Sequence, residues 1–210
     1  MIVLSETTEP SHHRVFELIA GHPALDLVNT LDWRFRAEGP EEFLESYQDL
    51  LDFCEQSGLL NSQQTRRLLR STAPDFAARE LARVRNLREA VATVLYAALD
   101  QRDPTPASVQ VLESSFRLAH KHQHLLWTPS GMVWELPHDD AAPELPLLLL
   151  SLSTEALLTS DDISKLRACG NLECRWLFLD TSKNHTRRWC DMKICGNRMK
   201  ARRFKAQHRT

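Results

Sequence analysis

The chain has 210 residues, 42% of them hydrophobic and 26% charged, with a formal net charge of -2 at pH 7. These values are typical of a soluble globular protein, and the length suits one large domain or two modest ones. The longest apolar run, residues 145–150, is interrupted by Pro146 and is far too short to span a bilayer, so we expect no membrane partner.

The charge is distributed unevenly along the chain. Residues 165–210 contain 13 Lys and Arg but three acidic residues, a net charge of +10, so residues 1–164 carry a net charge of -12. An acidic body joined to a basic segment indicates two roles in one chain, with the basic segment meeting a polyanion. The first residues, MIVLSETTEPSHHR, do not resemble a signal peptide, so we expect a cytoplasmic protein.

The first elements are a short strand and a helix. Residues 15–19 predict the strand, and beyond Pro23 the apolar residues recur at helical spacing. Asp26 and Asn29 lie three residues apart on this helix. They either face water and order the preceding turn or form the edge of a ligand site, and we treat both as candidate ligand-binding residues.

Longer helices follow, with one hairpin among them. On the second helix Cys54 falls at a core position and is interpreted as a buried apolar side chain. Asp75 is expected to cap the fourth helix, whose arginines Arg79, Arg83, Arg85 and Arg88 interleave with Glu80 and Glu89 as a solvated, salt-bridged face. Apolar spacing and turn residues predict helices over 41–57, 61–70, 76–101, 107–124 and 147–158, and a β-hairpin over 125–136.

Residues 1–162 are therefore predicted to form a mainly helical α+β domain with a small sheet or hairpin. His120 and His124 share a helix face, but no neighbouring cysteine or carboxylate completes a metal site, so we interpret them as a solvated helix end. The body has no glycine-rich phosphate loop, internal repeat or nucleophile elbow, so we do not expect an enzyme. A role in ligand sensing or in forming a homo-oligomer is expected instead.

Four cysteines in the basic segment carry the strongest functional signal. Two pairs with four residues between their members, separated by 15 residues, have the spacing of a closed four-thiolate site, which is typical of structural zinc: Cys169, Cys174, Cys190 and Cys195. We expect one structural Zn²⁺, although an all-sulfur set also suits iron. A redox dithiol is a weaker alternative because neither pair is C-x-x-C.

The residues around the cysteines predict a treble-clef-like zinc finger over 163–210. A knuckle at 169–174 is followed by a predicted hairpin, 176–180 with 186–189, and by a final helix over about 196–207. On that helix Arg198, Arg202, Lys205 and Arg209 form a cationic stripe, with Phe204 expected to face the hairpin. Guanidinium groups suit phosphates and guanine edges, so we expect DNA contacts from Arg187, Arg188, Arg198, Lys200, Arg202, Arg203 and Lys205.

Two segments resemble a known pair of domains. LRACGNLECRWLFLDTSKNHTRRWCDMKICGNRMKARRF resembles the CGNR zinc-finger family, including its namesake Cys195-Gly196-Asn197-Arg198, and GHPALDLVNT at 21–30 resembles the start of the ABATE domain. The resemblance implies a bacterial protein proposed to be a stress-responsive transcription regulator, with a DNA-binding finger and a ligand-sensing N-terminal domain. Asp26 and Asn29 match the family's LDLVNT pattern, which favours a functional role for them.

Four readings of the chain stay open at this point. A DNA-binding regulator leads, and the same basic surface would also suit structured RNA. A finger that binds another protein is a third reading, and a body that acts as an enzyme is the fourth.

Overall fold

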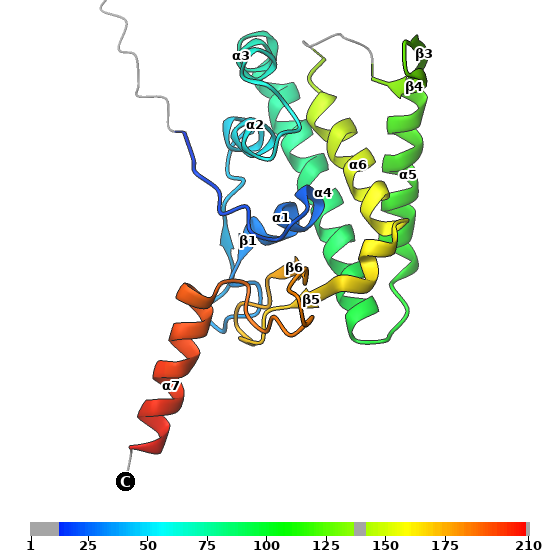
Figure 1. Ribbon diagram of the computed structural model, residues 1–210. Helices are drawn as coiled ribbons and strands as arrows, with labels where there is room; N and C mark the ends of the chain where they lie inside the picture. Colours follow the sequence, from blue (N-terminus) through cyan, green and yellow to red (C-terminus); the bar gives the residue numbers. More distant parts are fainter. Residues whose placement is uncertain (1–12, 137–141, 209–210) are drawn as a thin grey trace, which may run out of the picture.

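The computed structural model describes residues 13–136 and 142–208. Its centre is a layer of three helices that pack side by side (Figure 1). These helices are α4 (Pro74–Leu99), α5 (Pro106–His122) and α6 (Leu145–Leu158). The shorter helices α1 (Pro23–Asn29) and α2 (Tyr47–Gln56) pack against both α4 and α6, and α3 (Ser62–Ser71) packs against α2.

The strands form three separate two-stranded antiparallel sheets. The pairs are β1 (Leu31–Asp32) with β2 (Glu41–Glu42), β3 (His124–Thr128) with β4 (Gly131–Glu135), and β5 (Leu166–Ala168) with β6 (Leu177–Leu179). Leu126 lies opposite Val133, so the hairpin predicted over 125–136 is present. A mainly helical body with small hairpins confirms the predicted α+β class.

Two helices begin elsewhere than the apolar spacing predicts. The helix expected over 41–57 is α2, which starts later because Ser46 and Asp49 form a capping box. Helix α4 begins at Pro74, whose missing N–H suits the first helical position, so Asp75 lies inside the first turn and does not cap the helix. Asn61 caps α3, which begins at Ser62.

The strand predicted over 15–19 is wrong. The segment is extended, but it pairs with no strand in the described part of the chain. Instead the side-chain amide of Gln56, on α2, accepts from the N–H of Phe16 at 2.9 Å and donates to the carbonyl of Arg14 at 2.7 Å. A primary amide offers the donor and acceptor of a peptide group, so one side chain satisfies this stretch of backbone.

One arginine of α4 is not on a solvated face. Arg88 is 3% exposed and donates to the two carboxylate oxygens of Glu42, on β2, at 2.6 and 2.7 Å. The predicted salt-bridged solvent face is therefore wrong for Arg88, because its partner comes from a distant strand. Arg83, by contrast, is exposed and pairs within the helix with Glu80 at 2.7 Å.

The hydrophobic core continues from the helices into the C-terminal segment. Leu147 and Leu150 of α6 are buried, and Cys54 is buried as predicted. Phe178 of β6 belongs to the same buried cluster as Leu25 of α1. The core therefore crosses the predicted boundary between residues 1–162 and 163–210, and that boundary stays a prediction.

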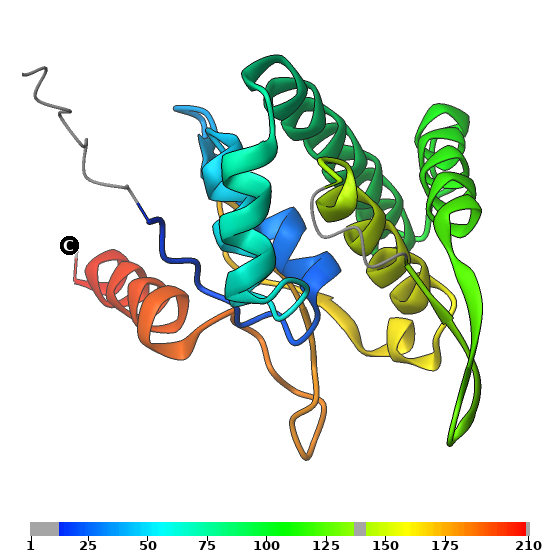
Figure 2. The same ribbon diagram turned by 90° about the horizontal axis from the view of Figure 1, so that it is seen from above.

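The β3–β4 hairpin and the C-terminal helix α7 (Asn197–Gln207) project at opposite ends of the molecule (Figures 1 and 2). The hairpin exposes two large aromatic side chains, Trp127 by 78% and Trp134 by 64%. Throughout the described ranges, no helix combines the length and apolar character needed to cross a membrane.

Candidate metal centre and basic helix

Cys169 and Cys174 lie on the turn that joins β5 to β6. The N–H of Cys169 donates to the carbonyl of Trp176 at 2.8 Å and closes the base of this turn. The carbonyl of Asn171 accepts from Cys174 at 3.0 Å and from Arg175 at 2.9 Å. Arg175 has a φ of 50°, in the left-handed region, and there the chain reverses into β6.

The C-terminal hairpin predicted from the sequence is wrong in its pairing. Strand β6 pairs with β5 and not with residues 186–189, because its other edge is already occupied. The N–H of Leu179 donates to the carbonyl of Ala20 at 2.8 Å, and that of Leu177 donates to Oδ1 of Asn29 at 2.9 Å. These bonds take up the edge of β6 that faces away from β5.

Cys190 and Cys195 lie at the entrance of α7. Between them Asp191 begins a π-helical turn, and its carboxylate accepts from the N–H of Ile194 at 2.9 Å. Gly170, in the turn that carries the first cysteine pair, allows the two halves of the finger to approach each other. Its N–H donates to the carbonyl of Arg188 at 2.9 Å, and a Cβ there would lie 3.2 Å from that oxygen.

The four cysteine sulfurs converge on one point. All lie within 4.8 Å of one another, and all four residues are buried. The sulfurs of Cys174 and Cys190 are 3.7 Å apart. Tetrahedral zinc with bonds of about 2.3 Å would set its thiolates about 3.8 Å apart, whereas a disulfide needs about 2.05 Å. The spacing therefore fits four ligands of one ion and no disulfide.

The surroundings of the sulfurs also suit thiolate ligands. Nδ2 of Asn171 donates toward Sγ of Cys195 at 3.8 Å, the kind of outer contact that orients a metal ligand. Asn171 is not among the residues predicted to support the metal site, although an Asn two residues after a ligand cysteine is a usable signal. Within the described residues no second cluster of three metal ligands occurs, at the α5 histidines or elsewhere.

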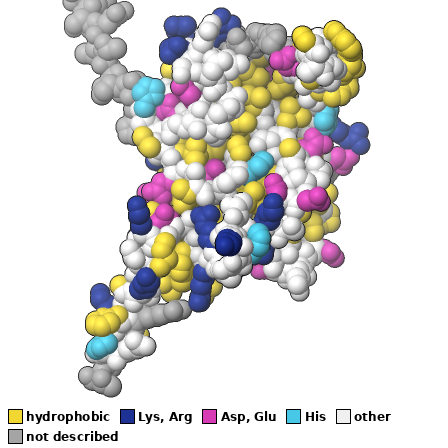
Figure 3. All heavy atoms as spheres, in the orientation of Figure 1, with side chains coloured by type: hydrophobic (Ala, Val, Ile, Leu, Met, Phe, Trp, Pro, Cys, Tyr) yellow, Lys and Arg dark blue, Asp and Glu magenta, His cyan; other side chains and the backbone are white. Residues whose placement is uncertain are grey.

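Helix α7 carries most of the predicted DNA-contacting residues away from the body. Its described side chains past the first turn are exposed, including those of Lys200 and Lys205. Figure 3 shows Lys and Arg side chains on this projecting segment. Phe204 is 63% exposed and stacks on His208, so the expectation that it faces a hairpin is wrong. The side chain of Arg203 and the whole of Arg209 lie outside the described part of the structure.

Three of the predicted contacts have partners within the chain. The guanidinium of Arg198 lies 4.6 Å over the ring of Trp33, and Arg202 pairs with Glu173 at 2.8 Å. Arg188 is exposed beside the ring of Trp189. The contact of Trp33 with Arg198 was not predicted, because nothing in the spacing of the chain places the loop after β1 beside α7.

Arg187 differs from the others because its guanidinium is built into the fold. It lies 4.2 Å over the ring of Phe178 and donates to the carbonyls of Trp189, Cys190 and Ile19. Its backbone N–H donates to the Asp180 carboxylate at 2.9 Å. These contacts hold the loop between the cysteine pairs against the body.

Comparison with known families agrees with this arrangement. Residues 21–161 match the ABATE family model, described as "Putative stress-induced transcription regulator". The chain belongs to the ABATE family. Residues 165–208 match the CGNR zinc-finger model, which includes all four cysteines, so the cluster is the site of one structural zinc ion. Both resemblances predicted from the sequence are confirmed, and no curated protein matches the chain.

The ABATE body and the CGNR finger are joined through α1. The amide of Asn29 donates to the carbonyl of Leu177 and accepts from its N–H, both at 2.9 Å. Asp26 accepts from the N–H of Ala20 at 3.0 Å, and burial raises the pKa of this carboxyl to about 6. Both side chains are buried, so the ABATE residues Asp26 and Asn29 position the finger. A ligand role for them stays a prediction.

Replacement of Asn29 by Ala should destabilise the junction. The variant leaves the buried N–H and carbonyl of Leu177 without partners, at a cost of about 1–3 kcal/mol for each group. We expect the urea midpoint of the zinc-loaded protein, followed by circular dichroism, to fall accordingly. Asn86→Ala, at an exposed position of α4, is the control and should change little. Equal midpoints for the two variants would contradict a structural role for the Asn29 amide.

Proposed function

We propose that the CGNR finger binds duplex DNA and that the ABATE chain regulates transcription through this contact. The observation that supports this most is the form of α7, a basic helix that starts at the zinc site and projects from the body (Figure 1). The major groove admits an α-helix, and Arg and Lys on its surface can reach phosphates and guanine edges. The family description of a regulator agrees with this function and does not describe an enzyme.

The contact surface that we propose is defined by Arg188, Arg198, Lys200, Arg202 and Lys205. Arg187 is left out because its guanidinium already serves three carbonyls inside the finger. The pair between Arg202 and Glu173 is no obstacle, since their side chains are 49% and 39% exposed and such pairs contribute little. A phosphate can therefore replace Glu173 as the partner of Arg202.

The double variant Arg198→Ala/Arg202→Ala tests this surface. If each guanidinium contributes about 1–3 kcal/mol, DNA affinity should fall at least about thirtyfold. Loss of two cationic contacts should also reduce the slope of log affinity against log salt by about two. Both quantities come from fluorescence anisotropy with a duplex selected from a random pool, measured from about 50 to about 200 mM salt.

The matched control is Arg79→Ala/Arg117→Ala, which removes the same charge from exposed positions of α4 and α5. It should leave both affinity and salt slope unchanged, and both variants should retain one zinc per chain. Affinity that survives Arg198→Ala/Arg202→Ala would mean that α7 is not the contact surface. Preferential binding of a structured RNA competitor would transfer the proposal to RNA. A salt-insensitive complex with a protein would favour a protein-interaction finger.

The regulatory signal would enter through the ABATE body. We propose a small-molecule effector for this role, and the cavity next to the finger is the place where it would act on α7.

A homo-oligomer would present two fingers to DNA, and the molar mass of the zinc-loaded chain in light scattering tests that arrangement.

A further inference from the structure

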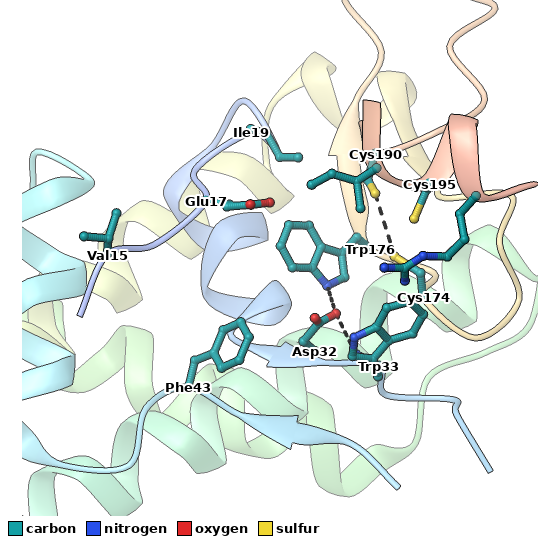
Figure 4. A pocket seen from close by; sticks show the side chains of 12 residues that line it. Val15, Glu17, Ile19, Asp32, Trp33, Phe43, Cys174, Trp176, Cys190 and Cys195 are labelled. Carbon is teal, nitrogen blue, oxygen red and sulfur yellow. Dashed lines mark hydrogen bonds between the residues drawn. The ribbon is translucent and has the colours of Figure 1, made fainter. Parts of the chain in front are cut away.

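A cavity of about 330 Å³ lies between the N-terminal extended segment, the loop after β1 and the finger (Figure 4). This volume is in the range of small-molecule sites. In Figure 4 Cys190 and Cys195 lie at one end, and Val15 and Phe43 lie at the other. The zinc site therefore closes one end of the cavity, and most of its length runs away from the metal along aromatic side chains.

The aromatic walls are held in place by a single carboxylate oxygen. Oδ1 of Asp32 accepts from the indole Nε1–H of Trp176 and from the backbone N–H of Trp33, both at 2.7 Å. Trp33 has a φ of 48°, a left-handed conformation that is strained for a bulky side chain. Strain of this kind is kept where surrounding structure enforces it, commonly at ligand sites.

The polar groups of the cavity favour a cation. Among the lining residues, Asp32 and Glu17 supply two carboxylates against one guanidinium, that of Arg198, while Arg36 lies outside the lining, 5.6 Å from the centre of the Trp33 ring. In the described part of the chain Glu17 has no hydrogen bond or ion pair, and Oδ2 of Asp32 accepts no hydrogen bond. The chain itself already holds a cation on this wall, because the guanidinium of Arg198 lies 4.6 Å from the Trp33 ring centre.

We propose that this cavity binds a small organic cation with an aromatic or apolar body. The charged head would lie between the carboxylates of Asp32 and Glu17, against the faces of Trp33 and Trp176. Rings attract cations through their electron-rich faces, and they do so more strongly where water is excluded. The apolar part of the ligand would fill the end lined by Phe43 and Val15.

Occupancy of the cavity would act on the finger through Arg198. This residue belongs both to the cavity wall and to the basic surface of α7, so a bound cation repels its guanidinium and competes with it for Trp33. Displaced from Trp33, Arg198 becomes available to DNA. This step rests on the proposed function, and linkage requires that DNA in turn tightens cation binding by the same factor.

Calorimetric titration of the zinc-loaded full chain, without DNA, tests the cation site. The probes are benzyltrimethylammonium, neutral benzyl alcohol and anionic phenylacetate. We expect saturable one-to-one binding of benzyltrimethylammonium, at least about tenfold tighter than either other probe. Asp32→Asn/Glu17→Gln should abolish this preference, and Asn at 32 keeps an acceptor for both tryptophan N–H donors. Glu113→Gln, on an exposed face of α5, is the matched control and should keep the preference.

Equal affinity for the three probes, tighter binding of phenylacetate, or no binding would each overturn the cation site. The coupling is tested separately, by DNA affinity in saturating benzyltrimethylammonium chloride against an equal concentration of sodium chloride. We expect DNA affinity to rise about threefold or more. An unchanged affinity would overturn the coupling alone. A chain that binds the cation but no DNA would overturn the proposed function and leave the cation site standing.

Discussion

Loss of zinc will unfold the finger and lower the stability of the helical body in the same transition. Structural zinc contributes roughly 10–16 kcal/mol of apparent binding free energy in small fingers. The finger has few apolar contacts of its own beyond β5 and β6, so it cannot keep its fold without the metal. This is the largest effect that we expect from any single change to the chain.

The body should respond because the finger completes its core. Phe178 and Leu177 of β6 are fully buried in the cluster that contains Leu25 of α1. The hydroxyl of Tyr96, on α4, donates to the carbonyl of Arg175 in the knuckle at 2.9 Å. When the finger unfolds, these apolar side chains and buried polar groups lose their partners, so the helices are destabilised as well.

Cys174→Ser is the variant that tests this coupling, and Cys54→Ala is its control. The first should lose zinc and show one thermal transition, by circular dichroism, well below that of the zinc-loaded chain. The second removes a buried thiol that is not part of the four-cysteine cluster and should retain one zinc per chain, with only the modest loss of stability expected of a small core cavity. If Cys174→Ser lost zinc but the helical body kept its melting temperature, the finger and the body would not unfold cooperatively.

Replacement of Arg88 by Ala will lower the free energy of unfolding by about 3 kcal/mol or more. Breaking a buried ion pair is costly because it leaves the partner charge without compensation. Arg88 bridges Glu42 on β2 and Glu89 on its own helix, and it also donates to the hydroxyl of Thr30 at 3.2 Å. Its loss removes the buried donor of Glu42 and of the Thr30 hydroxyl, while Arg34 still pairs with Glu89 and the N–H of Leu44 still donates to Glu42.

The matched control is Arg117→Ala, which breaks a pair with Glu113 that is exposed on both sides. Exposed pairs contribute roughly 0–1 kcal/mol, so the control should unfold close to the parent. Urea denaturation of the zinc-loaded variants measures both. A loss for Arg88→Ala no larger than that for Arg117→Ala would show that the Glu42 pair does not stabilise the body. Arg88→Met should unfold at a higher urea concentration than Arg88→Ala if side-chain volume contributes to stability. It should not recover the stability that is lost with the Glu42 ion pair.

Local features of the sequence predict most of the elements and the whole metal site. The caps at Asn61 and the periodic apolar residues of α4, α5 and α6 place helices correctly to within a few residues. The four cysteines identify the zinc ligands, because two short spacings are enough to turn each pair onto one ion. The fold class and the family could be inferred on these grounds.

Only the tertiary structure decides the contacts between elements that lie far apart in the chain. The pairing of β6 with β5 follows from Asn29 and Ala20, which occupy the other strand edge from 148 and 159 residues away in the chain. The burial of Arg88 depends on a carboxylate of β2, and the position of Arg198 depends on Trp33. Spacing along a chain encodes periodicity and capping, which are local. Spacing does not encode which distant strand edge, carboxylate or aromatic ring will contact a given polar or charged group. That partner is determined by the packing of the complete core.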